Sequence, residues 1–218
     1  MSQLYSDISL YGAGFMEAAW VVLLITVATI FLSWIFGLLA VLGKRSNLVL
    51  LRAIASFYVW FIRGTPALIQ VFIIYFGLPQ VGINPSPFMA GVIALGLNSG
   101  AYVAEIIRSG LLAIPNGQFE SSQALGMSHP ETMVRIVLPQ VFRIILPPLT
   151  NEAIAALKNT SLLSTITVVD LTLYAQTIIS TTFRPFQFFI ATAVIYLILT
   201  TMLTQLSSWM ERRQVRLS

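Results

Sequence analysis

The sequence predicts an all-α integral membrane protein with about five transmembrane helices, forming a single domain over residues 1–218. The composition favours this class, because 57% of the residues are hydrophobic and only 9% are charged. A soluble domain carries a charged fraction of about one quarter. The pattern agrees with the composition, since long apolar segments recur along the chain, bounded by proline, glycine or charged residues.

The first apolar segment, Met16 to Leu42, is long enough to cross a bilayer as a helix. A helix needs roughly 20 residues to span about 30 Å of hydrocarbon. No Lys or Arg precedes this segment, so no signal peptide is evident and we expect the segment to remain in the mature protein. Four further spans are expected, at about Ala67 to Leu78, Phe88 to Ile107, Ile136 to Leu157 and Phe188 to Trp209. The first of these four is allowed to begin before Ala67.

The second span is expected to be broken. Leu48 to Ile62 is amphipathic to apolar, and Arg63-Gly-Thr-Pro interrupts the run before it resumes at Ala67. Proline disfavours helix at the residue before it, and glycine lets the backbone turn, so one helix should end near the cytoplasmic face and another begin at Pro66. Arg63 is then either a snorkelling side chain at an interfacial turn or part of a substrate path or its gate.

Basic residues predict the orientation of the spans. They lie between the first two spans, around the third and fourth, and at the end of the chain: Lys44, Arg45, Arg52, Arg63, Arg108, Arg135, Arg143, Arg212, Arg213 and Arg216. Arg184 alone is expected in a loop on the other side. By the positive-inside rule, the amino terminus is outside, and the segment Gly110 to Arg135 and the carboxyl terminus are cytoplasmic.

Polar side chains inside the third and fourth spans should face protein or a cavity, because ionisable groups are costly in lipid. Glu105 and Arg108 are three residues apart, which predicts a local ion pair near the surface. Glu152 and Asn159 are seven residues apart and share a helix face, whereas Lys158 is rotated from Glu152 by about a third of a turn. A direct pair between Glu152 and Lys158 is therefore not expected.

A polar segment from Glu120 to Pro139 separates two apolar segments. Its first residues are small and helix-forming, Gly126 can end or bend the helix, and Pro139 restricts where the next helix starts. We predict a short helix across the membrane surface, from Glu120 to about His129, then a sharp turn into the next span. Such a helix is a docking site on which a partner protein could push.

Several function classes are disfavoured by what the sequence lacks. It has no cysteine, so a disulfide framework and a thiolate metal site are excluded, and the single histidine, His129, cannot build a metal cluster alone. We interpret His129 as part of a helix start. Gly37 to Arg45 does not fit a phosphate-binding loop, because five residues separate its glycines and Arg follows Lys44. The chain is therefore predicted to be neither an enzyme nor an ATPase.

The spacing of the polar segment resembles the E-A-A-x-x-x-G-x(9)-I-x-L-P pattern of bacterial ABC importer permeases, with Ser121 and Ser122 in place of the alanines. Other segments resemble the polar amino acid permeases of the histidine, glutamine, arginine and cystine uptake group: Arg63-Gly-Thr-Pro, Tyr75-Phe-Gly-Leu-Pro, Asn98-Ser-Gly-Ala-Tyr-Val-Ala-Glu-Ile-Ile-Arg, Leu146-Pro-Pro-Leu-Thr-Asn-Glu and Lys158-Asn-Thr-Ser-Leu. The resemblance covers nearly the whole chain, from Met16 to Arg213.

The resemblance implies a type I importer permease fold with a cytoplasmic coupling segment at about residues 116–139. The residues expected to couple to the ATPase are Glu120, Ser121, Ser122, Ala124, Leu125, Gly126 and His129. The implied partners are ABC ATPase subunits that bind ATP and Mg, a second permease subunit, identical or homologous, and an extracytoplasmic amino acid-binding protein. The chain itself would hold no cofactor and no metal, would bind no nucleic acid, and would lie among the lipids of a bacterial inner membrane.

The implied function is the import of a polar L-amino acid by alternating access, driven by ATP hydrolysis in the partner. An ion-coupled secondary transporter is the alternative, but such proteins usually have more helices, often as internal repeats, and no repeat is detected here. A neighbouring reading frame for an ATPase would separate the two. The sequence leaves open which amino acid is carried and whether the two permease subunits are identical.

A zwitterion crossing the membrane needs partners for its carboxylate and its ammonium group, since burying either charge unpaired is costly. The candidates for lining such a path are Arg63, Thr65, Gln70, Asn98, Tyr102, Glu152, Lys158 and Asn159. Glu152 is the favoured acceptor, because it lies inside an apolar span and on the same face as Asn159. The alternative is a purely structural pair.

Overall fold

The computed structural model describes residues 2–215, which form helices and no strand, as the sequence predicts. The helices are α1 (Ser2–Lys44), α2 (Val49–Gly64), α3 (Ala67–Phe72), η1 (Ile73–Gly77), η2 (Leu78–Val81), α4 (Pro87–Leu112), α5 (Asn116–Ala124), α6 (His129–Thr132), η3 (Met133–Val137), α7 (Leu138–Asn159), η4 (Thr160–Ile166), α8 (Leu171–Thr182) and α9 (Pro185–Val215). Arg216, one of the basic residues used to predict the orientation, lies outside the described residues.

Four segments of the described chain are long and apolar enough to cross a membrane: Ser9–Lys44, Pro87–Leu112, His129–Ile166 and Pro185–Arg212. The bent pair Val49–Gly64 and Ala67–Val81 forms a fifth span if its two parts are counted together. The predicted number of about five spans is therefore confirmed. The first span has 36 residues and is about 54 Å long at 1.5 Å per residue, so it is longer than the hydrocarbon core of about 30 Å and has to tilt or extend beyond it.

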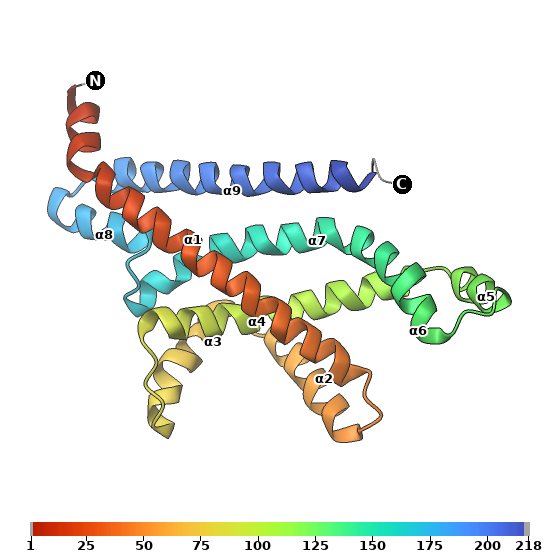
Figure 1. The fold of residues 1–218 in the computed structure, drawn as a ribbon. Coiled ribbons are helices and arrows are strands. Elements are labelled where there is room, and N and C mark those ends of the chain that lie inside the picture. The colour runs from red at the N-terminus through yellow and green to blue at the C-terminus, as the bar shows by residue number, and fades with distance from the viewer. Residues whose placement is uncertain (1, 216–218) are drawn as a thin grey trace.

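Helix α4 lies at the centre of the bundle, and α1 crosses it obliquely (Figure 1). Two glycines of α4 allow the close approach. A Cβ atom at Gly96 would lie 2.8 Å from the Cβ of Leu32, and one at Gly100 would lie 2.7 Å from the Cβ of Phe36. Small residues four apart are a common means of bringing membrane helices together, because the backbones gain van der Waals contact.

The predicted break in the second span is present, with α2 ending at Gly64 and α3 beginning at Ala67. The two parts are bent by 116°. Gln70 of α3 is hydrogen-bonded to Asn98, near the middle of α4, so the chain just after the break packs against the middle of α4. Local helix-breaking signals do not encode this contact.

The polar segment folds as two short helices joined by a tight reversal. The helix expected from Glu120 to His129 instead runs from Asn116 to Ala124, and His129 begins the next helix. Gly126 has a φ of +75°, a left-handed conformation that suits glycine and stops α5. Ser128 and Glu131 then form a capping box that starts α6.

The fourth span also begins earlier than predicted. It was expected at Ile136, but helical structure continues from His129 through the π-helical turn η3 into α7. Pro139 is the second residue of α7 and does not start a separate helix. Pro139 has no backbone N–H to donate to the preceding turn. The π-helical turn η3, which lies just before Pro139, is wider than an α-helical turn and lets the helix continue although that hydrogen bond is missing.

Candidate transport and coupling sites

Helices α5 and α6 project beyond the end of the bundle, at the end opposite α8 (Figure 1). We call residues 116–132 the extension. Most of the predicted coupling residues are exposed on it: Glu120, Ser121, Ala124, Leu125, Gly126 and His129. Leu125 is 80% exposed, a large apolar side chain with no cover in this chain. Ser122 is the exception, because it is buried.

Ser122 attaches α5 to α6 from the inside. The Thr132 hydroxyl donates to the Ser122 hydroxyl at 3.0 Å, and the Met127 amide donates to the Ser122 carbonyl at 3.0 Å. Phe119 packs against the buried cluster that includes Val137 and Ile145 of the fourth span. The buried hydrogen bond between Ser122 and Thr132 thus holds the two helices of the extension together, and Phe119 joins the extension to the fourth span by apolar contacts.

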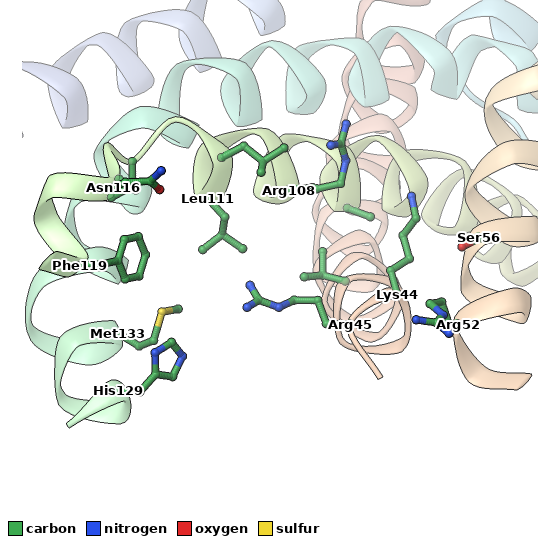
Figure 2. A pocket seen from close by; sticks show the side chains of 14 residues that line it. Lys44, Arg45, Arg52, Ser56, Arg108, Leu111, Asn116, Phe119, His129 and Met133 are labelled. Carbon is green, nitrogen blue, oxygen red and sulfur yellow. The ribbon is translucent and has the colours of Figure 1, made fainter. Parts of the chain in front are cut away.

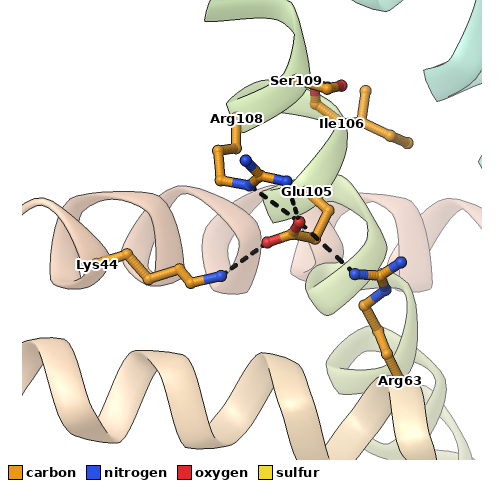
Figure 3. Close-up of polar contacts among 6 residues, drawn as sticks. All are labelled: Lys44, Arg63, Glu105, Ile106, Arg108 and Ser109. Carbon is orange, nitrogen blue, oxygen red and sulfur yellow. Dashed lines mark hydrogen bonds and ion pairs between the residues drawn. The ribbon is translucent and has the colours of Figure 1, made fainter. Parts of the chain in front are cut away.

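A second candidate site surrounds Glu105 in the carboxyl-terminal half of α4 (Figure 3). Its carboxylate lies 2.8 Å from the nearest Arg108 nitrogen, which confirms the predicted pair, and also 2.7 Å from Lys44 Nζ. Arg63 Nη1 lies 3.6 Å from the same carboxylate. One acid therefore faces three cations from α1, α2 and α4. We call these four residues the Glu105 cluster.

The sequence predicts only the Glu105–Arg108 pair and not the cluster as a whole. Lys44 is 61 residues from Glu105 along the chain, and only the packing of α1 against α4, which run in the same direction, brings the two together. The one available signal in the sequence is a single carboxylate near the end of the third apolar segment, in a chain whose Lys and Arg residues outnumber its Asp and Glu residues. Such a carboxylate is expected to attract cations from neighbouring helices.

A cavity of about 490 Å³ opens beside the Glu105 cluster. It is lined by Lys44, Ser56, Val59, Trp60, Arg63, Gly64, Tyr102 and Glu105. The guanidinium carbon of Arg63 lies 5.7 Å from the centre of the Tyr102 ring, a cation–π arrangement. The cavity combines a cation, a carboxylate and aromatic rings, and its volume is typical of small-ligand sites.

Three further candidates for the substrate path form a hydrogen-bonded network at the break. Gln70 donates through Nε2 to the Ile62 carbonyl at 2.8 Å and to the Thr65 hydroxyl at 2.8 Å. Asn98 donates to Gln70 Oε1 at 2.9 Å. Gln70 and Asn98 are 4% and 5% exposed. Their polar groups satisfy the backbone that the break leaves without helical partners, as buried backbone requires.

The remaining candidates lie elsewhere. Glu152 lines a cavity of only about 20 Å³ between α1, α4 and α7, together with Ser33, Trp34 and Ser99. A cavity of that size holds about one water molecule. Lys158 is exposed and Asn159 is partly buried at the end of α7. The structure therefore brings together Arg63 with Tyr102, and Thr65 with Gln70 and Asn98. Glu152, Lys158 and Asn159 do not line the cavity beside the Glu105 cluster, and Glu152 lies next to Ser99.

Asp170, which is not among the residues singled out from the sequence, is fully buried at the start of α8. Its carboxylate accepts a hydrogen bond from the Leu173 amide at 2.9 Å and one from the Tyr196 hydroxyl at 3.1 Å. Burial raises the pKa of this carboxyl, while the hydrogen bonds oppose the rise. Aspartate before an apolar helix is a helix-start signal that could have identified it. Among the residues that the structure describes, no cluster of His, Cys, Asp and Glu could hold a metal ion.

Comparisons with known proteins give consistent matches. Residues 33–216 match the family model described as binding-protein-dependent transport system inner membrane component. The L-cystine transport system permease protein TcyB of Bacillus subtilis is 41% identical over 193 residues, which cover 86% of this chain and 82% of that protein. The glutamine transport system permease protein GlnP of Escherichia coli is 40% identical over 181 residues, covering 82% and 83%.

Solved structures agree with this fold. A crystal structure of an amino acid ABC transporter with histidines is 40% identical in sequence, with a TM-score of 0.89, and the match covers 95% of this chain and 97% of that one. The MetNI methionine ABC transporter in an inward-facing conformation matches with a TM-score of 0.74 at 19% identity, which concerns the fold alone. The predicted importer permease fold is therefore confirmed.

Proposed function

Because this chain belongs to the family of binding-protein-dependent transport system inner membrane components, we propose that it is the permease subunit of an ATP-driven importer that carries a polar L-amino acid into the cytoplasm. Relatives named for cystine and glutamine transport support an amino acid as the substrate class. The partners in this proposal are ABC ATPase subunits that bind ATP and Mg, a second permease subunit and an extracytoplasmic binding protein. The chain is then the transport subunit, and hydrolysis occurs in the ATPase.

The extension is the observation that carries the proposal. It projects beyond the end of the bundle and presents Leu125 with no cover. Ser122 and Thr132 hold its two helices together, and Phe119 packs against residues of the fourth span. An apolar residue exposed at the tip of a fixed helical projection suits docking into a groove of a partner. Closure of two ATPase subunits would then move the extension and, through the buried contacts, tilt the spans between outward-open and inward-open states.

The substrate path is proposed to pass the cavity beside the Glu105 cluster. Arg63 supplies a cation for the carboxylate of an amino acid, and Glu105 supplies an acceptor for the ammonium group. Tyr102 and Trp60 provide apolar and aromatic surface beside them. Thr65, Gln70 and Asn98 hold the break that places Arg63 at this cavity, whereas Glu152, Lys158 and Asn159 remain candidates for other steps along the path.

Docking can be tested by reconstituting the complex in proteoliposomes with its ATPase and loaded binding protein. Leu125→Lys should reduce ATP-dependent uptake to about a tenth or less, because a charged side chain does not enter an apolar groove without losing about 2 kcal/mol. Leu125→Met preserves volume and apolarity, and should keep uptake within about twofold. Folding is checked by the thermal midpoint of each variant.

Two results would contradict the proposal. Uptake by the Leu125→Lys variant at the parental rate would remove the extension from the coupling step. Uptake that follows an ion gradient and continues without ATP would favour the secondary transporter instead. Measuring uptake with ATP, without ATP, and with an imposed gradient separates these outcomes.

A further inference from the structure

A basic pocket of about 590 Å³ lies between the bundle and the extension. The ends of α1 and α4 and the start of α2 form one part of its wall, and residues of the extension and of η3 form the other (Figure 2). This pocket is separate in chemistry from the proposed substrate cavity, because its lining includes four Lys and Arg side chains and no carboxylate: Lys44, Arg45, Arg52 and Arg108.

Two of these cations have no acidic partner. Lys44 and Arg108 share Glu105, which lies outside the lining. Within residues 2–215, by contrast, Arg45 and Arg52 form no ion pair. The side chain of Arg45 extends toward the middle of the space, and Arg52 and Ser56 lie beyond it on the α2 side (Figure 2). The pocket therefore holds an uncompensated positive charge.

The opposite wall of the pocket is mainly apolar. Leu111, Phe119 and Met133 lie across the space from Arg52 and Ser56 (Figure 2). Leu112 also lines the pocket and is 71% exposed. An inorganic anion would gain nothing from such a wall, whereas a molecule with an anionic head and apolar chains would use both parts of the lining.

We propose that this pocket binds an anionic phospholipid, with the phosphate group at Arg45 and Arg52 and the beginning of an acyl chain against Leu111, Leu112 and Phe119. The pocket lies at the ends of the apolar spans that include α1 and α4. The end of a span is where a helix leaves the hydrocarbon and meets the phospholipid headgroups. Basic pockets between helix ends on the cytoplasmic side are known to suit such headgroups. The orientation of the chain is the only part of the proposed function on which this inference depends.

Occupancy of the pocket would affect the extension. The bound lipid contacts α1 and α2 on one side, and Phe119 of α5 on the other, so it joins the bundle to the docking helix. An acidic peptide of a partner could use the two arginines, but it would leave the apolar wall without matching contacts. The lining as a whole therefore favours a lipid.

The test is native mass spectrometry of the purified transporter complex in micelles containing equal amounts of phosphatidylglycerol and phosphatidylcholine. We expect selective retention of phosphatidylglycerol. The double variant Arg45→Gln with Arg52→Gln should retain it about tenfold less, since each basic residue near the headgroup contributes to binding. The double variant Arg45→Lys with Arg52→Lys keeps both charges and should retain it within about threefold.

Arg143→Gln is the matched control, because Arg143 is an exposed cation on α7 that does not line the pocket. It should leave retention unchanged. Equal retention of both lipids, or full retention by the double Gln variant, would overturn the proposal. Displacement of the lipid by millimolar inorganic phosphate would instead assign a free-anion site, and its displacement by added ATPase subunits would assign the pocket to a protein interface. The test measures lipid retention and not uptake, so failure here is distinct from failure of the proposed function.

Discussion

Glu105 joins three helices through one side chain. Its carboxylate binds Lys44 of α1 and Arg108 of α4 at ordinary ion-pair distances, and Arg63 at the end of α2 lies slightly further away. The side chain of Glu105 is 16% exposed, so these charges are less screened than a surface pair. Removing the carboxylate leaves three cations close together with no counter-charge.

Glu105→Gln should therefore lower the stability of the chain by about 2 kcal/mol, because like charges repel and the amide replaces no ion pair. The measurement is the thermal midpoint in detergent, which should fall by about 5 °C. Glu131→Gln is the matched control. Its ion pair with Arg135 is exposed at 4.0 Å, and Gln keeps the capping box, so the expected change is below about 0.5 kcal/mol. Equal effects of the two variants would show that the cluster is not a structural centre.

Arg63 is the residue most directly assigned to substrate. Arg63→Gln should raise the KM for uptake about tenfold or more, because the carboxylate of the amino acid loses its charged partner. The readout is the concentration dependence of uptake in proteoliposomes, with ATPase stimulation by the loaded binding protein as a second measure. Arg143→Gln removes an exposed cation that does not line the cavity, and it should change neither the KM for uptake nor the ATPase stimulation. A KM that does not move would assign Arg63 to the Glu105 cluster alone.

At the scale of elements, the broken second span depends on one amide. Gln70 bonds to the Ile62 carbonyl before the break, to Thr65 within it and to Asn98 on the neighbouring helix. The Tyr58 hydroxyl adds a bond to the Leu97 carbonyl at 2.6 Å, so both sides of the break are attached to α4. The bend is thus maintained by α4 and not by the proline alone.

Gln70→Leu should destabilise the chain by about 3 kcal/mol, because buried polar groups of Asn98 and of the backbone at Ile62 lose their partner. The matched control is Gln80→Leu, since Gln80 is exposed and makes one long bond of 3.4 Å to the Phe76 carbonyl. That change should be below about 0.5 kcal/mol. Thermal midpoints of both variants give the comparison, and a stable Gln70→Leu variant would contradict the role assigned to the network.

For the whole molecule, orientation is the property that most needs measurement. The absence of cysteine from the chain allows clean single-cysteine labelling. In whole cells, Ser180→Cys near the end of α8 should react with an impermeant thiol reagent, because Ser180 is exposed at the end of the molecule opposite the extension. Ser121→Cys on α5 should react only after the membrane is opened. The reverse pattern would overturn the predicted topology and move the lipid pocket to the other leaflet.

The fold could be predicted to a large extent. Apolar length alone predicted the spans, and the Gly-Thr-Pro sequence predicted the break within a residue of its observed place. The predicted bounds of the docking helix, Glu120 to about His129, were less accurate, since α5 runs from Asn116 to Ala124. Asn116 to Phe119 carries weak helix signals and was not included in the docking helix, although Phe119 is held there by packing on the fourth span.

What the sequence determined by itself is local: which segments are apolar enough to prefer lipid, where proline and glycine interrupt a helix, and which polar segment projects from the membrane. Tertiary structure alone decided which polar side chains meet. Lys44 reaches Glu105, and Gln70 reaches Asn98, because helix packing brings together residues that are far apart along the chain. Glu152 lies in a separate small cavity between α1, α4 and α7 for the same reason, since the face of a helix is predictable but the neighbour of that face is not.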